Sequence, residues 1–195
     1  MQILVLNGSP KGENSITLQT VRYLEKKFPE HTFDVLHVGQ RIKSLEKDFA
    51  KAEEAIKKAE LLLFCYPVYT FLVPSQLHRF IELVKEHEID LTGKKAAQIS
   101  TSLHFYDITA HRFIRDNCDD LDLPYLGGLS GDMEDLLKER GRKQAEDFFR
   151  FILWRGERGL AEPKRCGEPK PFVPAPLSET AAPEMVSGGR VAFTY

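Results

Sequence analysis

Met1-Gln2-Ile3-Leu4-Val5-Leu6 runs directly into Asn7-Gly8-Ser9-Pro10-Lys11-Gly12-Glu13-Asn14-Ser15, and this junction decides the fold. A short apolar run that contains Ile and Val is typical of a buried parallel strand. A helical pattern begins at Ile16, so the loop rich in Gly, Ser and Asn opens directly into a helix. Unpaired N–H groups and the helix dipole make that end positive. The junction therefore predicts a phosphate-binding loop between a strand and a helix.

Two familiar phosphate loops do not fit this stretch. A Walker A loop needs a glycine where Glu13 stands, and Gly8 and Gly12 have the wrong spacing for the dinucleotide fingerprint. The alternative to phosphate binding is an ordinary helix N-cap at Asn14 or Ser15. This stretch by itself leaves both interpretations open.

The composition excludes several classes of protein. The chain has 195 residues, 42% of them hydrophobic, and a net charge of -2, without the basic stripe that indicates nucleic-acid binding. Its longest apolar run, 61–66, is too short for a bilayer, and a strand from residue 1 leaves no room for a signal peptide. Cys65, Cys118 and Cys166 form no zinc or disulfide pattern. We expect no metal and no membrane partner, and a cytoplasmic location.

Strand-like and helix-like segments alternate along most of the chain. The patterns predict strands at 1–6, 32–38, 61–66, 96–100 and within 121–129, and helices at 14–28, 45–59, 74–84, 108–118 and 132–154. This alternation predicts an α/β fold of three layers, with a doubly wound, five-stranded parallel sheet in the flavodoxin-like order 2-1-3-4-5. Gly127-Gly128 indicates that the last strand lies at an edge. The loops after the first, third and fourth strands should line one cleft.

The composition changes near residue 155. Residues 1–155 form the predicted domain, and its last helix should pack through Leu136, Leu137, Phe148, Phe149 and Ile152. Residues 156–195 are rich in Pro, Glu, Lys and Ala without periodicity, which predicts an extended tail or linker. The final residues, 190–195, are typical of a strand. That strand would either begin a second domain of a longer protein or pair with a partner subunit.

The loops after the third and fourth strands suit a flat heteroaromatic ring. In the first of them, Pro67 fixes the exit from the strand, and Tyr69 or Phe71 can stack on a ring. The second loop, 100–107, offers hydroxyls, amides and another aromatic group. Together with the phosphate loop, these walls predict a mononucleotide site.

The first two loops resemble those of one known family. Residues 7–15 resemble the phosphate loop of the NAD(P)H-dependent FMN reductase family, which includes iron–sulfur flavoproteins. Tyr66-Pro67-Val68-Tyr69, followed by Val73-Pro74-Ser75-Gln76-Leu77, resembles the family's second signature, whose backbone faces the isoalloxazine ring. The resemblance spans about residues 1–153 and is weaker at the third loop. It implies a flavodoxin-like fold that binds FMN, and a homo-oligomer.

One departure from the family is informative. Iron–sulfur flavoproteins carry a cysteine cluster after the second strand, and the corresponding stretch here, 37–43, has no cysteine. A [4Fe–4S] cluster needs four thiolates and the chain has three cysteines, so this chain alone cannot hold one.

The resemblance implies three groups of FMN-binding residues. The phosphate would lie against Ser9, Lys11, Asn14 and Ser15. The ring would lie along Pro67, Val68, Tyr69 and Thr70, and its other side would be closed by Ser100, Thr101, Ser102 and His104. Simpler readings stay open for some residues: Lys11 as a solvated lysine, His104 as an exposed loop residue, Asp107 as a helix cap.

The implied activity is that of an FMN-dependent oxidoreductase. It would take electrons from NAD(P)H and pass them to a small-molecule or protein acceptor. We name no catalytic side chain, because the reactive atom belongs to the cofactor. The alternatives are a flavodoxin-like electron carrier without nicotinamide turnover and a cofactor-free interaction module.

Overall fold

The computed structural model describes residues 1–102 and 106–164. Its described part contains one parallel sheet in the order β2-β1-β3-β4-β5, which confirms the predicted flavodoxin-like topology. The strands are β1 (Gln2–Asn7), β2 (Thr32–Leu36), β3 (Leu61–Pro67), β4 (Lys95–Thr101) and β5 (Tyr125–Gly131). The helices are α1 (Ile16–Lys27), α2 (Val38–Leu45), α3 (Ala50–Lys58), α4 (Ser75–Glu86), α5 (Ile108–Asp120) and α6 (Glu139–Glu157).

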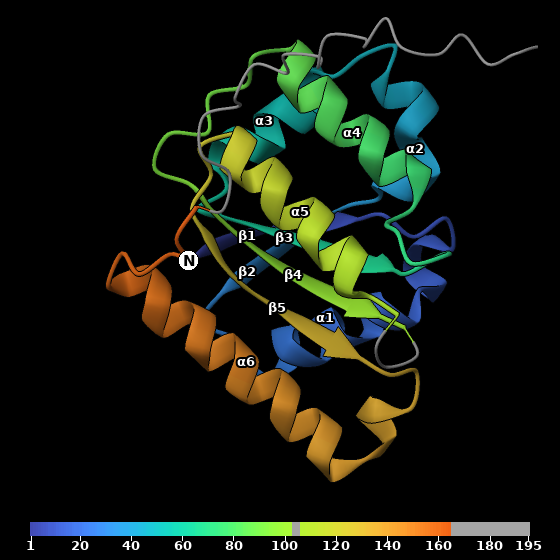
Figure 1. Ribbon diagram of the computed structural model, residues 1–195, viewed down its shortest axis with the longest axis vertical. Coiled ribbons are helices and arrows are strands. Elements are labelled where there is room, and N and C mark those ends of the chain that lie inside the picture. Colours follow the sequence, from blue (N-terminus) through green and yellow to red (C-terminus); the bar gives the residue numbers. More distant parts are fainter. Residues whose placement is uncertain (103–105, 165–195) are drawn as a thin grey trace, which may run out of the picture.

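The helices cover the sheet in two layers, as Figure 1 shows, with α2 to α5 on one face and α1 and α6 on the other. Alternate residues of β1 divide between two apolar cores: Leu4 and Leu6 pack under α2 to α5, and Ile3 and Val5 pack against α1 and α6. Strand β3 is buried on both faces, as expected of a central strand.

The strand register brings four strand ends to one edge of the sheet. Asn7 pairs with Cys65, Pro67 pairs with Thr101, and Thr101 pairs with Gly131. The loops that follow β1, β3, β4 and β5 therefore begin side by side. This is the edge at which open α/β sheets bind ligands.

The predicted bounds of two elements were wrong. Strand β2 ends at Leu36, and a separate helix, α2, begins at Val38 where a strand residue was expected. Val38, Ile42 and Leu45 have helical spacing and pack into the core, so tertiary burial selects a helix there.

The last helix was also misplaced at its start. It begins at Glu139 rather than at residue 132, after a short 3-10 helix, Asp135–Leu137. Gly141 lies so close to Asp135 that a Cβ would stand 2.2 Å from the Asp135 carbonyl oxygen. The chain thus reverses sharply between these residues, and Leu137, expected in the core, is 80% exposed. Phe149 and Ile152 are fully buried, as predicted.

The residues after α6 fold back onto the domain. The Glu162 N–H donates to the Tyr125 carbonyl at 2.8 Å, and the Glu162 carboxylate pairs with Arg115 at 2.5 Å. The proposed extended tail and the terminal strand at 190–195 lie mostly outside the described residues and stay predictions. Among the helices of the described ranges, none has the length and apolar character needed to cross a membrane.

Candidate flavin site

The loop after β1 is organised by the side chain of Asn7, which is fully buried. Its Oδ1 accepts from the Ser9 N–H at 3.1 Å, and its Nδ2 donates to the Gly12 carbonyl at 3.0 Å. The Gly8 N–H donates to the Cys65 carbonyl at 2.9 Å and ties the loop to β3. The loop is therefore fixed by the protein itself, which preorganises it for a ligand.

A second network fixes the loop from outside. Asn7 Nδ2 lies 3.1 Å from His37 Nδ1, and His37 Nε2 lies 3.0 Å from a Glu13 carboxylate oxygen. Because Asn7 donates, Nδ1 accepts and Nε2 carries the proton toward Glu13. Burial opposes ionisation of Glu13, but hydrogen bonds and charges from Arg22 and His37 outweigh it and lower the pKa of this carboxyl below its ordinary 4.5.

The start of α1 presents unused donors beside this loop. The Ser15 hydroxyl oxygen caps the helix by accepting from the Leu18 N–H at 3.5 Å, and Ser9 Oγ accepts from the Lys11 N–H at 3.2 Å. Both hydroxyls accept in these bonds, so their own protons stay available. Of the two candidate caps, Asn14 and Ser15, it is Ser15 that caps the helix, and this cap leaves a donor for an anion.

Thr17 gives the clearest indication of a ligand-binding site. Its Oγ1 is buried and has no hydrogen-bond partner among the residues that the structure describes. The backbone N–H groups of Ile16 and Thr17 lie in the first turn of α1, where no acceptor within the helix exists. An orphaned buried hydroxyl next to such N–H groups fits a phosphate.

These groups form one end of a cleft of about 260 Å³. The cleft is lined by residues from four loops and the first turn of α1: Ser9, Lys11, Ser15, Ile16, Thr17, Pro67, Val68, Tyr69, Thr101, Ser102 and Met133. The structure thus brings together most of the predicted residues, namely Ser9, Lys11, Ser15, Pro67, Val68, Tyr69, Thr101 and Ser102. One end is rich in donors and the other is largely apolar, as a phosphate-bearing ring requires.

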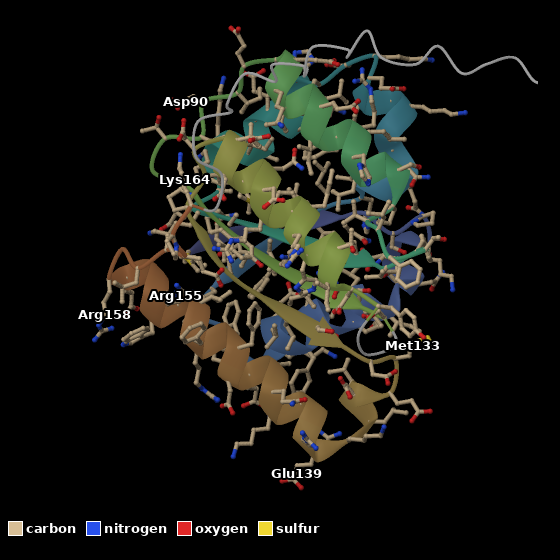
Figure 2. The ribbon with its side chains drawn as sticks, viewed as in Figure 1. Asp90, Met133, Glu139, Arg155, Arg158 and Lys164 are labelled. Carbon is tan, nitrogen blue, oxygen red and sulfur yellow. The ribbon has the colours of Figure 1, made fainter. Side chains whose placement is uncertain are left out.

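Three lining residues were not expected. Ile16 and Thr17 follow the predicted cap and could have been found, because first-turn N–H groups are the usual anion ligands. Met133 follows β5, and Figure 2 shows it beyond the carboxyl end of that strand. No local signal marks Met133, since its place depends on the reversal before α6.

The remaining predicted residues lie elsewhere. Asn14 is exposed in a short 3-10 helix, Gly12–Asn14, and does not line the cleft. Thr70 lines an adjoining hollow with Phe71 and Tyr106. Ser100 is buried against Asp107 and His111 and does not line the cleft, and His104 lies outside the described residues.

The loop after β3 makes a tight turn at the cleft rim. The Tyr69 N–H donates to the Leu72 carbonyl at 2.9 Å, and the Leu72 N–H donates back at 3.0 Å. Thr70 and Phe71 between them have positive φ values of 50° and 67°. This backbone is that of a type I′ turn, which is strained for a β-branched residue such as Thr70. The turn holds Phe71 half-exposed, with its ring centroid 5.3 Å from that of Tyr106.

The chain is similar to known flavin proteins. The family model described as NADPH-dependent FMN reductase matches residues 1–112, and no curated protein matches. An apo NADH:FMN oxidoreductase (EMOB) is 18% identical with a TM-score of 0.62, over 78% of this chain and 89% of that one. An FMN-dependent NADH-azoreductase from Bacillus anthracis str. Ames Ancestor, solved with FMN, is 11% identical with a TM-score of 0.56, over 82% and 100%. An NAD(P)H:quinone oxidoreductase from Methanothermobacter marburgensis is 14% identical with a TM-score of 0.58, over 85% and 99%.

At these identities the solved structures show a shared fold. The family match is more informative, because it spans more than half of the chain and includes both the phosphate loop and the loop after β3. With the sheet order and the cleft described above, it identifies this chain as a member of the NADPH-dependent FMN reductase family.

Proposed function

We propose that the cleft at the ends of β1, β3, β4 and β5 binds FMN, and that the protein passes electrons from NAD(P)H to a small acceptor. The observation that carries this proposal is the buried hydroxyl of Thr17 at the start of α1, which has no partner within residues 1–102 and 106–164. An unsatisfied buried polar group costs about 1–3 kcal/mol, which a phosphate oxygen would offset. When bound, FMN supplies the redox chemistry, and the protein supplies position and electrostatics.

The phosphate end of the cleft has donors from side chains and backbone. Hydroxyls of Ser9, Ser15 and Thr17, with the N–H groups of Ile16 and Thr17, would donate to the phosphate oxygens. Lys11 forms no ion pair with the residues described and would add positive charge. The role of Asn14 stays a prediction, because it would have to approach from outside the cleft.

The ring end is formed by the loops after β3 and β4. Pro67, Val68 and Tyr69 would lie along one side of the ring, and Thr101 and Ser102 along the other. The Val68 N–H donates to the Thr101 carbonyl at 3.0 Å, so the two walls are held at a fixed separation. The place of His104 here stays a prediction.

The rim of the cleft favours a planar acceptor. Phe71 and Tyr106 are each about half-exposed and form an aromatic edge next to the ring site. Lys11 is the only charged residue that lines the cleft among the described residues. We infer a flat, weakly charged acceptor, of which quinones are one class. One structural relative is itself described as an NAD(P)H:quinone oxidoreductase.

The same rim supports the inference of a homo-oligomer. Tyr69, Phe71, Leu72 and Met133 are all between 40% and 58% exposed around the cleft. An apolar surface of this kind commonly marks an interface. A second copy of the chain would cover it. A reducing compartment such as the cytoplasm is supported by Cys65 and Cys118, which are both free thiols.

The test is a titration of the purified protein with FMN, followed by anaerobic stopped-flow mixing with NADH and NADPH. We expect FMN uptake and loss of flavin absorbance on mixing. Uptake without bleaching would instead indicate an electron carrier, and the absence of FMN uptake would indicate a cofactor-free module.

The double variant Ser9→Asp with Ser15→Asp should abolish FMN binding by charge repulsion. Ser44→Asp, exposed at the end of α2, is the control. Unchanged affinity of the double variant would refute the phosphate assignment.

A further inference from the structure

A second cavity, of about 450 Å³, lies between α5 and β5. It shares no lining residue with the flavin cleft. Most of its lining is polar, including His111, Arg112, Tyr125 and Ser130. Figure 1 shows α5 running over β4 and β5 on this side of the sheet. Flavin binding gives these residues no role, so their polar groups are available to another ligand.

Two polar atoms converge on one point of this cavity, in front of Gly128. A Cβ at position 128 would stand 2.8 Å from the Tyr125 hydroxyl oxygen and 2.9 Å from His111 Nδ1. Gln98 Cγ is equally close, at 2.8 Å, so a side chain at position 128 would not fit. The Tyr125 hydroxyl and His111 Nδ1 therefore border the same part of the cavity, next to the bare backbone of Gly128. Gly128 has an ordinary φ, so backbone conformation does not demand glycine there.

The hydrogen bonds around His111 fix what Nδ1 offers. Ser100 Oγ lies 2.8 Å from His111 Nε2 and donates to an Asp107 oxygen at 3.3 Å, so Nε2–H donates to Ser100. Burial lowers the pKa of His111 against the opposing charge of Asp107. The ring is therefore neutral near pH 7, and Nδ1 presents a lone pair to the cavity.

Tyr125 offers the opposite group. Its hydroxyl oxygen accepts a hydrogen bond from Gln98 Nε2. Burial raises the pKa of Tyr125, so the phenol keeps its proton and can donate it. A ligand atom in front of Gly128 thus meets one donor and one acceptor. A hydroxyl group satisfies both at once.

Among the described residues, two anions and two cations line the cavity, and three of them have polar partners. Asp107 is engaged by Ser100 and lies 3.6 Å from His111, and Glu162 is engaged by Arg115 and lies 3.7 Å from Arg155. Arg112 is exposed and forms no ion pair with any residue that the structure describes.

Arg115 provides a further donor. Its two terminal nitrogens are held by Glu162 and by the Pro163 carbonyl, while its buried Nε has no partner among the described residues. Within the described part of the chain, the cavity therefore has unpaired donors on Arg112 and Arg115 in addition to the Tyr125 hydroxyl.

We propose that the cavity between α5 and β5 binds a small hydroxylated oxyanion, a carboxylate or a phosphate ester. Its anionic group lies at Arg112, and its hydroxyl group lies between Tyr125 and His111 in front of Gly128. Recognition needs both the anionic group and the hydroxyl group of the ligand, because a ligand with only one of them leaves polar groups of the cavity without a partner.

The test is a titration of the ¹⁵N-labelled, FMN-saturated protein followed by NMR, so that the phosphate loop is already occupied. D-gluconate and D-ribose 5-phosphate are the two oxyanion probes. D-ribose lacks the charge, and propionate lacks the hydroxyl groups. We expect gluconate, ribose 5-phosphate or both to shift the amide signals of Arg112, Gly128 and Ser130, and the two incomplete probes to act far more weakly.

Two variants with matched controls complete the test. Arg112→Gln should weaken binding about tenfold, the usual effect of one charge-assisted hydrogen bond, whereas Arg140→Gln, exposed on α6, should not. Gly128→Ala should abolish binding by filling the hydroxyl position, whereas Gly156→Ala should not, since its Cβ would meet only ordinary contacts of 3.5–3.6 Å.

The proposal is overturned if neither oxyanion shifts these amides, or if Arg112→Gln binds as well as the wild type. Shifts confined to residues 9–17 would mean that the probes bind only at the phosphate loop, which also overturns it.

Discussion

Gly39, at the start of α2, lies directly against the backbone of Ser9. A Cβ at position 39 would stand 2.4 Å from both the carbonyl carbon and the carbonyl oxygen of Ser9, closer than real contacts allow. Helix α2 therefore rests on the phosphate loop, and only glycine permits this approach. The position of the loop depends on a helix that contributes no residue to the cleft.

Gly39→Ala tests this dependence. The added methyl group must push α2 and the loop apart, so we expect FMN affinity to fall at least about tenfold and stability to fall by about 1–3 kcal/mol. Flavin fluorescence titration and urea unfolding measure the two effects. Gly156→Ala, where a Cβ has room, is the control. Wild-type affinity in Gly39→Ala would mean that α2 does not position the loop.

Thr17→Val should weaken FMN binding without lowering the stability of the FMN-free protein. Valine has nearly the shape of threonine without the hydroxyl that has no partner in the described structure. Without FMN, removing an unsatisfied buried hydroxyl should leave the protein equally stable or stabilise it by about 1 kcal/mol. With FMN, one phosphate hydrogen bond is lost, so the affinity should fall about tenfold. Thermal unfolding without FMN measures the change in stability, and thermal unfolding with FMN measures the change in affinity. Unchanged FMN affinity would mean that Thr17 does not contact the phosphate.

His111 should make stability depend on pH. Burial lowers the pKa of His111 from its ordinary 6.5, with Asp107 opposing. The unfolded chain then binds the proton more readily than the folded one, so stability is intact above about pH 6.5 and declines as the pH falls below it. His111→Gln, which can still donate to Ser100, should flatten this decline. Parallel curves of unfolding free energy against pH for the two proteins would contradict the assignment.

The described cysteines should be inert in the folded protein. Cys65 and Cys118 are buried, and burial raises the pKa of both thiols, so little thiolate is available. We expect a Cys166→Ser variant to react negligibly with a thiol reagent at mildly alkaline pH while folded. In urea, the unfolded variant should expose both thiols to the reagent. Rapid labelling of the folded variant would show that one of these cysteines is accessible.

Much of the fold could be predicted from local sequence patterns. The apolar runs at residues 3–6 and 61–66 mark strands because parallel strands are buried on both faces. Ser15 marks the start of α1 because its side chain caps free N–H groups. Helix α2 was missed because residues 32–38 read as one strand, and the turn at His37 is decided by packing.

The sequence by itself determined the sheet order and three of the cleft's walls, because periodicity and turn residues act over a few neighbours. Only the tertiary structure decided that Met133 reaches the cleft, that Gly39 rests on Ser9, and that Tyr125 meets His111 in front of Gly128. These contacts join residues far apart along the chain. They follow from strand register and helix packing, which no local pattern encodes.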